Sequence, residues 1–217
     1  YKTINFGAQV SAASNATART TVISTFLCPS DSYGSGDVFS PGEEGAGSND
    51  EETPDATPGS TQYARSNYPG CFGSEHMGGH DDHGGGGGGD EGLEPGEGNG
   101  IFLAGGANGE NAVSFRDVRD GLSKTIMIGE RDSRLGGSLW IGRGDGLEAM
   151  MSRVVGVGEH VFNGGDPHFE DFFSSHPGGV SFVFADGHVA FLSNGMSEAL
   201  FQSLSTRAGG EVVNGDY

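Results

Sequence analysis

Residues 176–192 constrain the fold of this chain more than any other segment. They contain two short runs, 180–184 and 188–192, on either side of Asp186-Gly187: Phe182 and Phe184 alternate with Val183, and Val189 and Phe191 alternate with Ala190. A period of two lets each run bury one face as a β-strand. Asp-Gly between such runs is a strong hairpin signal, because both residues tolerate the positive φ of the tightest turns. The segment therefore predicts a β-hairpin.

The rest of the chain adds short elements to this hairpin. With 217 residues, 42 Gly and 34% apolar residues, it can bury a core but spends much of its length in loops. Periodicity and capping residues predict short helices at 15–23, begun by an Asn15 cap, and at 197–205, and strands at 61–68, 125–128, 138–141 and 153–157. The expected fold class is α+β and β-rich: a pilin-like or sandwich-like antiparallel sheet with two or three short helices and long Gly/Asp/Glu-rich loops.

The expected organisation is one domain over residues 1–217 with two acidic loop segments. Residues 32–60 read as an acidic loop insertion, and residues 73–100 as a low-complexity loop rich in Gly, His and acids. The net charge of −19 excludes nucleic acid, whose phosphates need a basic surface, and disfavours anionic membranes. No apolar run is long enough to span a membrane. Because the chain opens at Tyr1 within a patterned segment, we expect a mature or truncated product.

Several phrases in order along the chain resemble one bacterial family, the prepilin-type H-x9-DG proteins, also described as a domain of unknown function and sometimes labelled solute-binding. The phrase that gives the family this description runs from His176 to Asp186-Gly187. The others lie at residues 1–6, 26–31, 67–70, 100–102, 120–126, 129–130, 173–179 and 204–211. The resemblance implies export, a location outside the cell or at its surface, and a role in a surface assembly. It implies no enzymatic activity.

The leading hypothesis is therefore a structural, pilin-like subunit that polymerises with copies of itself into an extracellular filament. The resemblance implies an N-terminal helix that the residues from Tyr1 onward do not contain; if that helix is absent from the protein, assembly would use another device. In the N-terminal segment, Ile4, Phe6, Ala8 and Val10 alternate as in a strand and could add to a neighbour's sheet edge. Two alternatives stay open: an extracellular module that binds calcium or surface glycans, and a minor pseudopilin of a secretion system.

Metal binding has two candidate regions. Imidazole and carboxylate groups that suit zinc cluster in the second loop, at His76, His80, Asp81, Asp82 and His83. A solvated, weakly chelating loop is the favoured interpretation there, because glycine-rich chain must be ordered on binding. Ca²⁺ suits an acidic exported protein better, with Asp31 and Asp37 as candidate oxygen ligands. The alternative for these acids is a solubilising surface.

The sequence offers candidates for two covalent modifications. Cys28 and Cys71 would pair as a disulfide in an exported protein and stay thiols in the cytosol; the loop-rich composition favours the disulfide. Asn15-Ala16-Thr17 matches the glycosylation pattern Asn-x-Thr, which also arises often by chance.

No catalytic site is predicted. One extended strand between His176 and Asp186 would hold them roughly 30 Å apart, too far for acid–base work within one chain. Asp186-Gly187 then reads as a turn, and His176 as a hydrogen-bonding residue at the strand entrance. We accordingly expect no enzyme.

Overall fold

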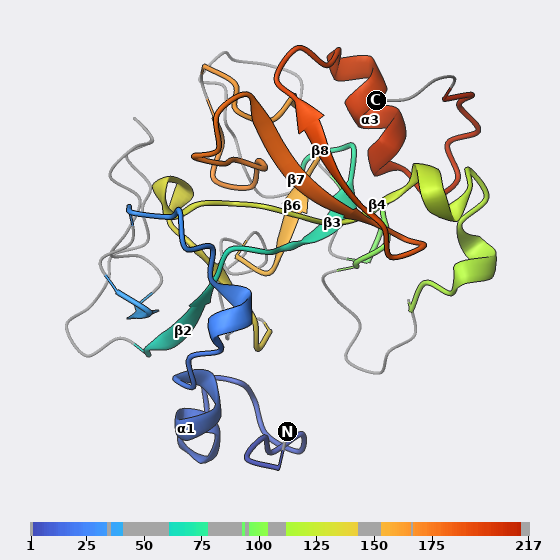
Figure 1. Cartoon of the computed structure of the whole chain (residues 1–217). Helices are drawn as coiled ribbons and strands as arrows, with labels where there is room; N and C mark the ends of the chain where they lie inside the picture. The colour runs from blue at the N-terminus through green and yellow to red at the C-terminus, as the bar shows by residue number, and fades with distance from the viewer. Residues whose placement is uncertain are drawn as a thin grey trace, which may run out of the picture.

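The computed structural model describes residues 2–33, 36–40, 61–77, 93, 96–103, 112–142, 153–165 and 167–213. These residues form an α+β, β-rich fold with two sheets and short helical turns (Figure 1). The elements that position the site are β1 Val38–Phe39, β2 Tyr63–Ser66, β3 Gly70–Gly73, β4 Ile126–Gly129, β5 Ser138–Leu139, β6 Val155–Val157, β7 Gly179–Phe184, β8 Val189–Ser193, α1 Ala16–Arg19 and α3 Glu198–Ser205.

The larger sheet has the strand order β6-β3-β4-β7-β8. All neighbouring pairs are antiparallel except β3 and β6, which run parallel. The sheet is therefore mixed, whereas the sequence predicted an antiparallel sheet. The smaller sheet has the order β1-β2-β5 and is antiparallel. In Figure 1, α1 and the N-terminal segment lie at the end of the molecule away from the larger sheet.

The predicted hairpin is confirmed as β7 and β8, paired from Gly179↔Ser193 to Val183↔Val189. Its turn closes through a hydrogen bond from the Gly187 N–H to the Phe184 carbonyl (2.9 Å). Of the two turn residues only Gly187 has positive φ (+91°), so Asp186 does not use the conformation expected of it. This pattern matches the longer hairpin loop in which glycine follows an ordinary turn.

An aromatic cluster fills the space between the hairpin and α3. Phe162, Phe182 and Phe201 are buried, with ring centroids 5.0–5.5 Å apart. Offset and edge-on contacts at these distances stabilise a core beyond the area that they bury. As predicted, α3 closes the fold, and its first turn is capped by Ser197, whose Oγ accepts from the Leu200 N–H.

Two expected boundaries are wrong. The predicted helix over 15–23 ends at Arg19, because the Thr20 and Thr21 hydroxyls donate to carbonyls four residues back and compete with helix propagation. The predicted loop over 32–60 contains β1, whose Phe39 is buried against Tyr63 and Leu139. This strand forms because Phe39 pairs with Tyr63, 24 residues further along the chain.

The strands predicted at 61–68, 138–141 and 153–157 are found with shorter bounds as β2, β5 and β6, and the strand predicted at 125–128 is found one residue further along as β4. No helix in the described part of the chain is long and apolar enough to cross a membrane.

Candidate functional site

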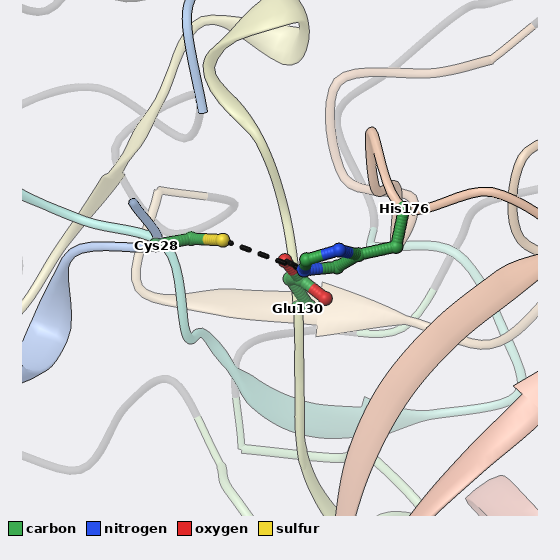
Figure 2. A group of neighbouring side chains, drawn as sticks. All are labelled: Cys28, Glu130 and His176. Atoms are coloured by element: carbon green, nitrogen blue, oxygen red, sulfur yellow. Dashed lines mark hydrogen bonds and ion pairs between the residues drawn. The ribbon is translucent and has the colours of Figure 1, made fainter. Parts of the chain in front are cut away.

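Three side chains from distant segments meet at one point beside the larger sheet: Cys28, Glu130 and His176 (Figure 2). The His176 Nε2 atom lies 3.1 Å from Glu130 Oε1 and 3.5 Å from Cys28 Sγ. All three polar atoms lie within 4.8 Å of one another. Cys28 and Glu130 are buried, whereas about a third of the His176 side chain is exposed.

Cys28 is fixed by Asn67, which precedes β3. The Asn67 Oδ1 atom accepts from the Cys28 N–H (2.8 Å), and the Asn67 N–H donates to the Phe26 carbonyl (2.8 Å). The Asn67 amide group also donates to Asp31 Oδ2 (2.7 Å) and to the Arg131 carbonyl (3.0 Å). One buried amide therefore attaches the Cys28 loop to the strand end that supplies Glu130.

Glu130 directly follows β4, and its backbone is held on both sides. Its N–H donates to the Ser181 carbonyl of β7, and its carbonyl accepts from Phe173. Its carboxylate is 3% exposed, and Oε2 has no hydrogen-bond partner among the described residues. A buried carboxylate oxygen without a partner is costly, because nothing replaces its lost hydration.

His176 enters the site from the turn before β7. The Ser174 Oγ accepts from the His176 N–H (3.1 Å), and the Ser174 N–H donates to Asn163 Oδ1 (2.8 Å). These bonds fix the backbone, so the imidazole reaches Glu130 and Cys28 with one ring nitrogen. The expected hydrogen-bonding role at the strand entrance is thus found, with Glu130 as a partner.

The electrostatics oppose a reactive thiolate. Burial, followed by the neighbouring Glu130, raises the pKa of the Cys28 thiol above its ordinary value. Burial also raises the pKa of Tyr68 to about 12, with further contributions from Cys28 and Glu130. In a nucleophile–base–acid arrangement, the acid orients the base through the ring nitrogen that the nucleophile does not use. Here thiol and carboxylate approach the same nitrogen.

An apolar pocket of about 520 Å³ is lined in part by Tyr68, which interacts with Cys28 and Glu130. Phe26, Phe102 and Trp140 form further parts of its wall. The Trp140 indole N–H donates to the Thr21 carbonyl (3.0 Å), and its ring packs on that of Phe26.

The Asp residues proposed as calcium ligands are not brought together. The Asp31 carboxylate is partly buried and accepts from Asn67 and from the Ser133 N–H (3.0 Å), so it anchors two loops. Asp37 is exposed, and its carbonyl accepts from the Arg65 N–H (2.8 Å). Within the described residues, neither belongs to a cluster of metal-ligating groups.

Of the predicted zinc-type loop, only His76 falls within the described residues, 3.6 Å from Glu159 Oε1 through its Nδ1 atom. His80, Asp81, Asp82 and His83 lie outside the described residues.

The predicted disulfide is not present. Cys28 and Cys71 are both free and buried in different surroundings. Cys71 sits in the main core with Sγ 3.7 Å from the Ser205 carbonyl, and burial raises its pKa to about 12. From the sequence, the only disulfide partner for each cysteine is the other one. In the fold, the neighbour of the Cys28 thiol is the His176 imidazole.

Asn15 departs from both of its predicted roles. It is 1% exposed, and its side chain binds the N-terminal segment rather than capping α1. Oδ1 accepts from the Asn5 N–H (2.8 Å), and Nδ2 donates to the carbonyls of Asn5 (3.1 Å), Ala8 (3.4 Å) and Gln9 (2.9 Å). A buried amide with these bonds is not available as a glycosylation acceptor in the folded chain.

The N-terminal segment itself consists of turns over residues 2–10, so the strand expected from Ile4, Phe6, Ala8 and Val10 is not formed in the single chain. Phe6 is 70% exposed, and Val10 packs against the core of the smaller sheet. The four side chains thus do not share one strand face here.

His176 and Asp186 occupy separate sites, as expected from the strand between them. Asp186 Oδ1 lies 2.6 Å from His188 Nδ1, within the hairpin turn. The hydrogen bond from the His188 N–H, followed by this side-chain contact, lowers the pKa of Asp186. Gly187 has a structural role in the hairpin turn, where it adopts the positive φ described above.

A second group that sequence reasoning missed contains His160, His168 and Asp171. His160 Nδ1 lies 3.7 Å from Asp171 Oδ1, and this carboxylate raises the pKa of His160 to about 9. Asp171 Oδ2 also accepts from the His168 N–H (2.9 Å). His160 and His168 lie within reach in sequence, but no local pattern placed Asp171 beside them.

A family model described as "Protein of unknown function (DUF1559)" matches residues 1–197. The chain belongs to this uncharacterised bacterial family. The description of the family names no activity, ligand or assembly. No curated protein and no solved structure shows a significant match to the chain.

Proposed function

We propose that this member of the DUF1559 family is a non-catalytic structural subunit, which assembles with further copies of itself into an extracellular filament. The observation that supports this proposal is the outer edge of the larger sheet, formed by β8. Surface glycans are not needed for this contact, which rests on strand pairing alone.

β8 has the features of an edge that pairs with another chain. It ends the strand order, so its outer N–H and C=O groups have no strand partner in the described residues. Its sequence, Val189-Ala190-Phe191-Leu192-Ser193, contains neither charge nor proline. Val189 and Phe191 are 67% and 51% exposed. Soluble proteins usually protect edges with charge, proline or bulges, and unprotected apolar edges invite strand addition.

The donor follows from symmetry. Two β8 edges pairing with each other would form a closed dimer, whereas an open filament needs two different surfaces in each contact. The N-terminal segment lies at the other end of the molecule from the hairpin (Figure 1). We therefore assign residues 2–10 as the strand that leaves its turns and adds to β8 of the next copy.

The test compares four versions of the chain by negative-stain microscopy and sedimentation: the parent chain, V189K/F191K, a deletion of residues 2–8 that keeps the Val10 packing, and Phe115→Lys. Phe115 is 66% exposed but lies outside the sheet edge, so its substitution is a matched control. We expect filaments for the parent chain and for Phe115→Lys.

The two edge and donor variants should remain folded monomers by circular dichroism. Filaments that persist in V189K/F191K would overturn the assignment of β8. Isolated particles for the parent chain would overturn the filament and favour a minor pseudopilin role.

A further inference from the structure

We infer that Cys28, Glu130 and His176 form a binding site for a divalent transition metal ion of the zinc class. This site is independent of filament formation and differs from the acidic and histidine-rich loops considered above. The site connects three segments: the loop that carries Cys28, the end of β4 that supplies Glu130, and the turn before β7 that supplies His176.

The donor set suits the ion. Thiolate, imidazole and carboxylate are the three side-chain ligands that zinc takes in proteins, and three of them with an open fourth position form a recurrent site. Here one of each meets, and the partly exposed His176 side chain leaves the group open to solvent on its side.

The spacing also suits it. Around a tetrahedral ion with Zn–S near 2.3 Å and Zn–N or Zn–O near 2.0–2.1 Å, ligand atoms lie about 3.3–3.6 Å apart. The observed separations are 3.5 Å from Sγ to Nε2 and 3.1 Å from Nε2 to Oε1. Both contacts use the same nitrogen, which carries at most one proton and so cannot donate to one group while accepting from the other.

The unpartnered carboxylate oxygen is an independent indication. Glu130 Oε2 is buried and lacks a hydrogen bond among the described residues, although Oε1 of the same group lies 3.1 Å from His176 Nε2. A cation at the convergence point offsets the cost of burying this charge. The ligands are also held in advance: Asn67 holds Cys28, β7 holds Glu130, and Ser174 holds His176. Such support from the surrounding shell raises metal affinity.

Binding replaces the thiol proton, which passes to solvent, and it requires His176 Nε2 in its unprotonated form. Affinity should therefore fall as the pH is lowered. The exchange needs no oxidant or reductant, and the protein gains a link between segments 148 residues apart.

The experiment must separate this site from other histidine and acid groups. We propose titration of the reduced full chain with Co²⁺, followed in the near ultraviolet, where a thiolate ligand gives an intense sulfur-to-cobalt absorption. Histidine and carboxylate sites, including His160, give no such band. The chain has only two thiols, so Cys28→Ser and Cys71→Ala form a matched pair.

We expect the band to saturate at one equivalent in the parent chain and in Cys71→Ala, to be absent in Cys28→Ser, and to be displaced by Zn²⁺. Glu130→Gln, which keeps the shape of the side chain, and His176→Asn, which removes the ligating Nε2 atom, should each weaken binding by at least tenfold while the thiolate band stays detectable at high Co²⁺. Absence of the band in the parent chain would overturn the inference. So would its survival in Cys28→Ser, or unchanged affinity in both Glu130→Gln and His176→Asn.

Discussion

Replacing Asn15 by alanine should release the N-terminal segment while leaving the rest of the fold intact. The side chain makes four contacts with this segment, of which those to the Asn5 N–H and the Gln9 carbonyl have near-ideal lengths of 2.8 and 2.9 Å. A third, to the Asn5 carbonyl, is 3.1 Å long, and the fourth is at the weak limit. At about 1 kcal/mol for each good bond, the loss is about 2–3 kcal/mol.

This loss should appear as local opening, because residues 2–9 belong to none of the described hydrophobic clusters. Hydrogen exchange measured on a peptide covering 2–12 should accelerate by about 30- to 150-fold, the factor that corresponds to 2–3 kcal/mol. Exchange in β7 and α3 should stay unchanged. If residues 2–10 are the assembly donor, the variant should also form filaments faster than the parent chain.

Two controls isolate the hydrogen bonds. Ser14→Ala alters an exposed neighbour, and Thr17→Ala removes the Asn-x-Thr pattern while keeping Asn15. Neither should accelerate exchange over 2–12. Unchanged exchange in Asn15→Ala, or equal acceleration in Thr17→Ala, would refute the view that this amide holds the segment.

Two further perturbations test the hairpin and the second histidine group. Gly179→Ala places a Cβ 2.0 Å from the Leu192 carbonyl oxygen across the hairpin, whereas Gly178→Ala, at φ +90°, meets no atom within 4 Å. In urea unfolding, we expect Gly178→Ala to cost about 1–2 kcal/mol through backbone strain and Gly179→Ala to cost clearly more; equal losses would contradict the packing described. For His160, the pKa raised to about 9 means that protonated His160 stabilises the fold below pH 6.5 and that this contribution disappears as the pH rises towards 9. Because His160 is partly exposed, the difference in unfolding free energy between the parent chain and His160→Gln should be less than about 1 kcal/mol at low pH. This difference should shrink as the pH rises over that interval. A difference that is constant with pH would count against the ion pair with Asp171.

The parts of the fold that sequence predicted are those with local causes. Alternation around Asp186-Gly187 specified the hairpin, and Ser197 with the apolar face of the following residues specified α3. Asn15 shows the limit of a local rule, because the same amide can cap a helix or bind a neighbouring loop. In this fold it donates to carbonyls of the N-terminal turns. A propensity does not say which partner is within reach.

The candidate site had no such local cause. From the sequence, Cys28 is interpreted as a disulfide partner and His176 as a strand-entrance residue, and Glu130 belongs only to a family phrase at 129–130. His176 does fill its predicted place, but its contact with Glu130 depends on β4 and β7 being neighbours. Sequence spacing contains no information on that adjacency, so the group emerged only with the tertiary fold.

The separation of Cys28 from His176 also sets an order of events as the chain is made. Synthesis from the N-terminus produces the thiol 148 residues before the imidazole that covers it. Closing a loop of that length costs roughly 4 kcal/mol of chain entropy, so the contact awaits the later strands rather than guiding them. An unfinished chain therefore presents an accessible thiol, and the completed chain hides it; chemical labelling of Cys28 would report whether the last third has folded.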